Sequence, residues 1–300
     1  LPLSHPPKPM SLISYRPGVS RLAIVCLVFL LGACSSTTFF YNRIDFFVGW
    51  YIDDYVNFNR AQQVVFDREL DQLLLWHRYE ELPRYGQVLD EFIVALGEDL
   101  TDVNLAQLYI DIEASVVRAQ AQVNTMAWSM AGELDAQQLV DLVDYLDEQQ
   151  LERETEFLGR DRLAYDEDAR DRFKDNLGDF LGRLTSDQRQ MISVGVTQLT
   201  RLDQAWLAER AHWNQILRDI FVDRDANWHQ QLKTALDERG GQRTLESRQQ
   251  YAHNTDITLA IIRDVINQRT PKQDRRLRSR LVKLRKDIAA LSGQLLVVQQ

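Results

Sequence analysis

The sequence has little cysteine. Of its 300 residues only Cys26 and Cys34 are cysteines, and both lie near the start of the chain. A fold held by several disulfides is therefore excluded, and so is a zinc site built on cysteine pairs. Beyond residue 34 the chain has no thiol for nucleophilic chemistry.

Motifs that carry known enzyme chemistry are also missing. The sequence contains no G-x-S-x-G elbow, no P-loop and no dinucleotide fingerprint, and its histidines form no H-E-x-x-H motif. His77 is followed by Glu80 and Glu81 in "WHRYEELPRY", a spacing that can place a carboxylate beside the imidazole on a helix. We interpret this group as a surface helix pair or a local hydrogen bond. The sequence predicts a protein without enzymatic activity, metal or cofactor.

A hydrophobic run long enough to span a membrane is absent. The apolar stretch from Leu22 to Ala33 covers twelve residues, whereas a spanning helix needs about 20. Arg16 and Arg21 precede it and small residues follow it, which is the order of a secretory signal. We predict a signal peptide over residues 1–33, with Met10 as the true start.

The end of this stretch resembles the lipobox of bacterial lipoprotein precursors. Leu31, Gly32 and Ala33 occupy the lipobox positions, and Cys34 is the residue that the resemblance implies to be acylated. Ser35, by resemblance to the sorting rules of Gram-negative bacteria, indicates the outer membrane. We therefore expect a lipidated tether over residues 34–38 and a lipid bilayer as the partner of Cys34.

Removal of the signal peptide changes the balance of charge. The mature chain would hold 32 basic against 44 acidic residues, a net charge of −12, and no disulfide could form within it. An acidic chain in the cell envelope is a poor partner for nucleic acid. An unidentified envelope protein or a polyanion is the expected partner besides the bilayer.

Proline is scarce after the tether, where only Pro83 and Pro271 occur. Glycine is also sparse, and strictly alternating β-branched runs are absent, so helices are favoured throughout. Helix starts are marked by capping boxes, in which a Ser, Thr, Asp or Asn is followed three residues later by Gln or Asn. These caps are Asn59, Thr101, Asp135, Thr185 and Thr270.

The caps and the apolar spacing predict an all-α fold, an elongated or two-lobed multi-helix bundle of about ten helices. We expect a single all-helical domain over residues 39–300. Irregular spacing of the caps excludes a solenoid repeat. The predicted helices cover residues 40–56, 60–81, 83–97, 102–131, 136–158, 161–182, 186–200, 203–222, 225–238, 246–268 and 271–291.

The last predicted helix is basic and amphipathic, with a stripe of leucines and isoleucine on one face. Two interpretations remain open. The favoured one packs the leucines inward and turns the cations toward the acidic segment 133–179; the other binds an anionic lipid or another polyanion. The candidate surface residues are Arg275, Arg276, Arg278, Arg280, Lys283, Arg285 and Lys286.

Aromatic residues gather in "FFYNRIDFFVGWYIDDYVNF", which begins four residues after Cys34. Aromatic side chains so close to a lipid anchor could lie in the membrane interface. Asp45, Asp53 and Asp54 would face an anionic surface unfavourably, so we favour a first core helix.

Four segments resemble an uncharacterised family of proteobacterial lipoproteins, known as a domain of unknown function. They are "YNRIDFFVGWYIDDYV", "LLLWHRYEELPRY", "LTSDQRQ" and "WLAERAHW". The resemblance implies an all-helical envelope lipoprotein and supplies no catalytic residues. A weaker resemblance, the L-T-x-x-Q motif at Leu184–Gln188, is to periplasmic chaperones of the Spy/CpxP type.

Together these features predict a lipid-anchored, periplasm-facing outer-membrane protein that acts as a non-enzymatic helical binding or structural module. The alternative is a periplasmic chaperone or envelope-stress factor that binds unfolded proteins.

Overall fold

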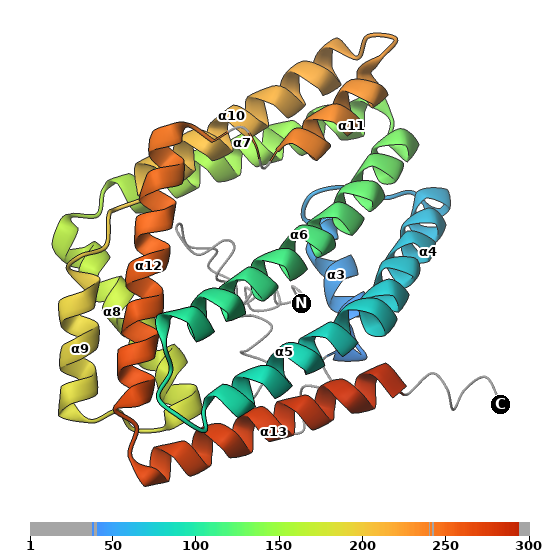
Figure 1. Cartoon of the computed structure of the whole chain (residues 1–300). Helices are drawn as coiled ribbons and strands as arrows, with labels where there is room; N and C mark the ends of the chain where they lie inside the picture. Colours follow the sequence, from blue (N-terminus) through green and yellow to red (C-terminus); the bar gives the residue numbers. More distant parts are fainter. Residues whose placement is uncertain (1–37, 39–40, 240, 242, 294–300) are drawn as a thin grey trace, which may run out of the picture.

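The computed structural model describes residues 38, 41–239, 241 and 243–293. Within these residues all regular structure is helical and no strand occurs, which confirms the predicted fold class. The helices, shown in Figure 1, are α3 (Ile44–Asp53), α4 (Arg60–Trp76), the π-helix η1 (His77–Glu81), α5 (Leu82–Ala95), α6 (Asp102–Glu133), α7 (Ala136–Leu158), α8 (Arg162–Leu181), α9 (Ser186–Val196), α10 (Asp203–Asp223), α11 (Trp228–Glu238), α12 (Leu245–Asn267) and α13 (Pro271–Gly293).

Helix starts follow the predicted caps. Asn59, Thr101, Asp135 and Thr185 each accept a hydrogen bond from the backbone N–H three residues on, and that residue's side chain accepts one from the cap N–H. Thr270 makes the same reciprocal pair with Gln273. Because each box satisfies orphan N–H groups of a helix end, the start is determined locally.

Four of these boxes, joined in two pairs, also hold distant helices together. The side-chain amide of Gln62 in α4 donates to Gln138 Oε1 in α7 at 2.8 Å. That of Gln273 in α13 donates to Gln188 Oε1 in α9 at 2.9 Å. Gln188 and Gln273 are both buried, so their amide–amide contact is shielded from water, whereas the contact of the buried Gln62 with the half-buried Gln138 is partly exposed.

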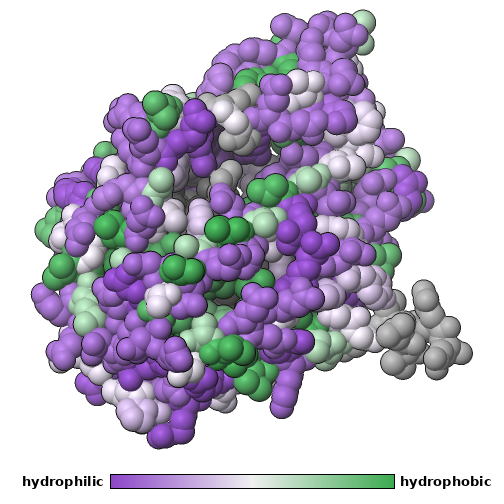
Figure 2. Space-filling model, in the orientation of Figure 1, coloured by the Kyte–Doolittle hydropathy of each residue, from purple (hydrophilic) through white to green (hydrophobic). Residues whose placement is uncertain are grey.

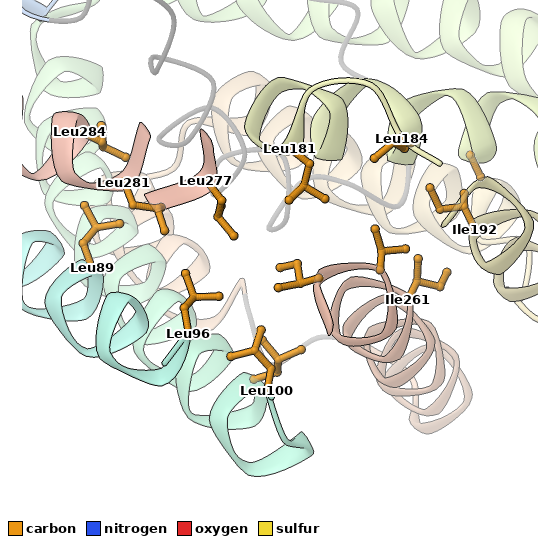
Figure 3. Packing of buried hydrophobic residues seen from close by; sticks show 14 of the residues in the cluster. Leu89, Leu96, Leu100, Leu181, Leu184, Ile192, Ile261, Leu277, Leu281 and Leu284 are labelled. Atoms are coloured by element: carbon orange, nitrogen blue, oxygen red, sulfur yellow. The ribbon is translucent and has the colours of Figure 1, made fainter. Parts of the chain in front are cut away.

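The described helices form two lobes. In the first lobe, α5, α8, α9, α12 and α13 surround a continuous apolar core, in which leucines of α5 and α13 point toward one another (Figure 3). In the second lobe, α7, α10 and α11 surround a second core. The 32-residue α6 spans about 48 Å, placing Leu105 in the first core and Ala131 in the second. It crosses the middle of the molecule in Figure 1.

Several predicted helix ends differ from the structure by a few residues, and the break predicted at Pro83 is absent. The helix was expected to end before Pro83, but helical backbone continues from α4 through η1 into α5. In η1 the N–H of Leu82 donates to the carbonyl of His77, five residues back. Such a π turn relieves the clash that a proline ring makes with the preceding turn of an α-helix, so Pro83 can follow it at the start of α5.

The packing of the first lobe can be tested by substituting two helical glycines, Gly195 and Gly178. A Cβ on Gly195 in α9 would overlap Ile261 Cγ1 of α12, whereas a Cβ on Gly178 in α8 would meet nothing. We expect Gly195→Ala to lower the free energy of unfolding by about 1–3 kcal/mol, because the overlap forces α9 and α12 apart. Gly178→Ala, the matched control, should raise it by about 0.5–1 kcal/mol through reduced backbone entropy of the unfolded chain. Urea unfolding of both variants measures the difference, and equal effects would contradict the close α9–α12 contact.

Candidate functional site

The predicted lipid-attachment residue Cys34 and the lipobox residues Leu31, Gly32 and Ala33 lie outside the described residues. Of the helices that the structure describes, none is both long enough and apolar enough to cross a membrane. Tyr41 is the first residue of the continuous described stretch 41–239.

Tyr41 is buried at the junction of η1 with the first lobe. Its Oη lies 2.8 Å from Nδ1 of His77, and the two rings stack with centroids 5.7 Å apart. The guanidinium of Arg78 lies 5.2 Å from the centre of the Tyr41 ring and donates to Asn42 Oδ1 at 3.0 Å. Two successive residues of the π turn thus hold two successive residues of the incoming chain. We call these four residues the tether dock.

The π turn is itself fixed to α6 by an ion pair between the buried Glu81 and the partly exposed Arg118. The Glu81 side chain is fully buried, and its two oxygens accept hydrogen bonds of 2.7 and 2.9 Å from Nε of Arg118. Ser115 accepts a further hydrogen bond from Arg118 at 2.9 Å. Removing the partner of a buried charge leaves that charge unpaired, which is strongly destabilising. The pair therefore holds η1 in register with α6.

The sequence interpretation of His77 as part of a surface pair is wrong. His77 is mostly buried and bonds to Tyr41, while Glu81 turns away to Arg118. Burial, and next the charge of Arg78, lowers the pKa of His77 to about 4. Burial raises the pKa of Tyr41 to about 12. Both groups are uncharged at neutral pH, so the Tyr41–His77 contact within the tether dock is a neutral hydrogen bond.

Two other histidines, His229 and His253, make contacts that explain their positions in the fold. His229 stacks on Trp128 with ring centroids 4.4 Å apart, and its Nε2 lies 2.9 Å from the Trp128 carbonyl oxygen. His253 Nε2 lies 2.9 Å from the carbonyl oxygen of Gln198. Across the described residues no group of three or more His, Cys, Asp or Glu side chains is arranged to hold a metal ion.

The aromatic helix α3 follows the tether dock and is not a core helix. None of its residues is buried; Val48 and Ile52 rest against the cluster around Phe66, while the aromatic side chains face outward. The exposed fractions are 67% for Phe46, 42% for Phe47, 53% for Trp50 and 45% for Tyr51. The favoured sequence interpretation of this segment is therefore wrong. In contrast, the face of the molecule seen in Figure 2 is mainly hydrophilic, with apolar residues in small separate groups.

The C-terminal helix α13 buries its apolar stripe, as the favoured interpretation expected. Leu277, Leu281, Leu284, Ile288 and Leu291 are all buried in the first lobe.

Three of its candidate cations have partners within the fold. Arg278 donates to Asp274 at 2.9 Å and also to the Leu96 carbonyl. Arg285 donates to Asp90 of α5 at 2.8 Å, passing over Gly86, where any Cβ would crowd the guanidinium. Arg280 is half-buried and also interacts within the fold.

The remaining cations of α13 form a separate exposed surface. Lys272, Arg275, Arg276, Lys283 and Lys286 are exposed, and at 3.6 residues per turn they fall within roughly 100° of the helix circumference. Arg276 donates a long hydrogen bond, 3.5 Å, to the Asp179 carbonyl at the end of the acidic segment. None of the five takes part in a salt bridge with another described residue. We call these five residues the basic face of α13.

An acidic hollow of about 490 Å³ lies between α7 and α10. Four carboxylates line it, and Arg218 is set among them, donating to Asp144 and Asp147 at 2.7 Å each. Arg218 supplies the positive charge that the four carboxylates attract. The clustering of acidic residues in the hollow is therefore explained by ion pairs within the fold. Its lining residues are Asp141, Asp144, Tyr145, Asp147, Glu148, Leu151 and Arg218.

Comparison with known families gives one match. A model described as a family of unknown function, DUF6279, matches residues 54–248, and the resemblance to an uncharacterised family is thereby confirmed. No curated protein and no solved structure matches the chain. The matched residues include the π turn and its partner Arg118, whereas α3 and α13 lie outside them.

The buried imidazole predicts a specific pH dependence of stability. An unfolded histidine has a pKa near 6.5, whereas His77 in the fold has one of about 4. As the pH falls from 6.5 to 4, the unfolded state binds a proton that the folded state does not, so stability is lost. We expect His77 to account for a loss of about 2–3 kcal/mol over this range.

Urea unfolding between pH 7 and pH 4 measures this loss. The variant His77→Phe should lose stability less steeply than the wild type as the pH falls, while the exposed His253→Gln should follow the wild-type slope. A His77→Phe variant with the wild-type slope would show that the imidazole is not held neutral by burial.

Proposed function

This chain belongs to the family of unknown function DUF6279, and we propose that it is a lipid-anchored envelope protein that faces the periplasm from the outer membrane. In this proposal it is a non-enzymatic helical module that binds or organises another envelope component. The observation that carries the proposal is the exposed aromatic face of α3, directly after the predicted tether.

Exposed aromatic side chains favour a membrane interface over water. Phe46, Phe47 and Trp50 point away from the core on one side of α3, and their exposure in water is unfavourable. Tryptophan and tyrosine rings are stabilised at the level of lipid headgroups, where the apolar ring and the polar edge both find partners. Asp53 and Asp54 lie at the end of α3 farther along the chain from the tether. Asp45 in the first turn is also exposed, but it lies about 100° around the helix from Phe46 and about 140° from Trp50, away from the aromatic side.

The tether dock supports the same arrangement. The buried Tyr41 is only the seventh residue after Cys34, so the backbone between them reaches at most about 24 Å. An acylated Cys34 would therefore hold η1 and the first turn of α3 close to the bilayer. Because Tyr41 is bonded to His77 and packed in the first core, the anchor would orient the folded body as well as retain it.

The lipid attachment is tested by metabolic labelling. Expressed in a Gram-negative host with labelled palmitate, the wild-type protein should carry the label, and Cys34→Ala should carry none and keep its signal peptide. Cys26→Ala is the matched control, because that cysteine lies within the predicted signal and should leave labelling intact. Membrane-bound, unlabelled wild-type protein would refute lipid anchoring.

The aromatic face is tested by its depth in the membrane. The proposed mature body has no free thiol, so Phe47→Cys supplies a single position for a fluorescent label. In vesicles of brominated phospholipid, the label at residue 47 should be strongly quenched. The same label at Leu163→Cys, an exposed position in α8 across the molecule from α3, should not be. Equal quenching at the two positions, or none at residue 47, would contradict the proposed contact.

A periplasmic chaperone is the second candidate, since exposed aromatic side chains can also bind unfolded chains. It predicts that the protein suppresses the aggregation of an unfolded client at a stoichiometric ratio. It further predicts that Phe46→Ser/Trp50→Ser abolishes the suppression without lowering stability, because both side chains are exposed. Absence of suppression by the wild type would exclude this candidate.

A further inference from the structure

We infer that the basic face of α13 binds the phosphate groups of an anionic lipid leaflet and so lays the folded body against the membrane. The inference rests on the proposed function for the lipid anchor, and it adds a second, electrostatic contact on a different helix. Its residues are Lys272, Arg275, Arg276, Lys283 and Lys286.

Arg276 makes one long hydrogen bond, 3.5 Å to the Asp179 carbonyl, and the other four cations make none with another described residue. The residues that fix α13 are the buried leucines, together with Arg278 and Arg285, which bond to neighbouring helices. The basic face lies on the opposite side of the helix from the leucines, and it forms no salt bridge with the other described residues. A helix that only needed solubility could carry either sign of charge there. An unpaired stripe of one sign points to a partner of the opposite sign.

The charge of the remaining surface makes this face distinctive. The chain as a whole is acidic, with a net charge of −9, so an anionic leaflet would repel most of it. Each lysine or arginine near such a leaflet strengthens binding about fivefold. Attraction confined to one helix would therefore orient the molecule, with α13 toward the lipid and the acidic α7, at the opposite edge in Figure 1, away from it.

The position of α13 agrees with the position of the anchor. Along its length α13 packs on α5, and it also contacts η1, which holds Tyr41. Figure 1 shows α13 along one edge of the molecule, beside α5 and near the π turn. A tether that leaves the fold at Tyr41 would thus bring α13 to the bilayer, within the about 24 Å that seven residues can span.

The spacing of the cations fits a leaflet better than a single small anion. From Lys272 to Lys286 the face extends for about 21 Å along a straight helix. The five side chains are exposed along the outer surface of one helix, and lipid phosphates can move laterally to meet each cation. A continuous anionic surface is therefore the occupant to which the geometry points.

The test places a label in the middle of the face. Ser279 is exposed between Arg275 and Lys283, so Ser279→Cys introduces a reporter with little change in shape. The lipid-anchored protein is reconstituted into vesicles of brominated phosphatidylcholine, with or without brominated phosphatidylglycerol. We expect strong quenching in the vesicles that contain phosphatidylglycerol, little in the neutral ones, and loss of the quenching at high salt.

Charge variants make the test specific. Lys283→Gln/Lys286→Gln should lower the ratio of docked to undocked protein roughly 25-fold, from two lost charges at about fivefold each. The matched control, Lys233→Gln/Arg248→Gln, removes the same charge from exposed positions of α11 and the start of α12, far from α13 in Figure 1, and should change nothing. Urea unfolding should give the wild-type stability for both variants, because the replaced side chains are exposed.

The outcomes separate this inference from the anchor. Protein that does not float with neutral vesicles would refute the lipid anchor, whatever α13 does. Protein that floats with them but shows no additional quenching with phosphatidylglycerol would overturn the inference. Quenching that the Lys283/Lys286 variant retains in full would overturn it as well.

Discussion

The paired glutamines of the capping boxes are the interaction on which the arrangement of helices depends. Gln188 and Gln273 each satisfy the first turn of their own helix and then bond to each other, and Gln188 is completely buried. Loss of either amide would leave a helix N–H and a buried polar group without partners, at the full cost of their desolvation. One pair of side chains thus fixes where α9 and α13 begin and how they meet. Gln62 and Gln138 do the same for α4 and α7.

Because the glutamine pair fixes the position of α13, it also determines where the proposed membrane-binding surface lies. With its start held at Gln273, α13 lies along α5 and buries its leucines, which leaves the basic face outside. The continuous helix from α4 to α5 then needs a π turn at Pro83, and that turn presents His77 and Arg78 to Tyr41 and Asn42. Core packing and the path of the incoming chain are therefore linked through adjacent residues of one turn.

Much of the fold could be predicted, because its signals are local. The boxes at Asn59, Thr101, Asp135 and Thr185 start helices where the sequence placed them. The error at Pro83 has a local explanation too, since no capping residue stands before the proline and a helix start there was unsupported. The tether dock was missed for a different reason. Tyr41 and His77 are 36 residues apart, and no periodicity relates them.

The sequence by itself determined the helical class, most helix starts, the acidic balance and the two faces of α13. It also places Cys34 in a lipobox-like segment, a prediction that rests on sequence alone. Only the tertiary structure decided that α3 exposes its aromatic residues, that Glu81 pairs with Arg118, and which cations of α13 remain outside. The physical reason is that capping and periodicity act within a few residues. Burial, in contrast, depends on which distant helix covers a given face.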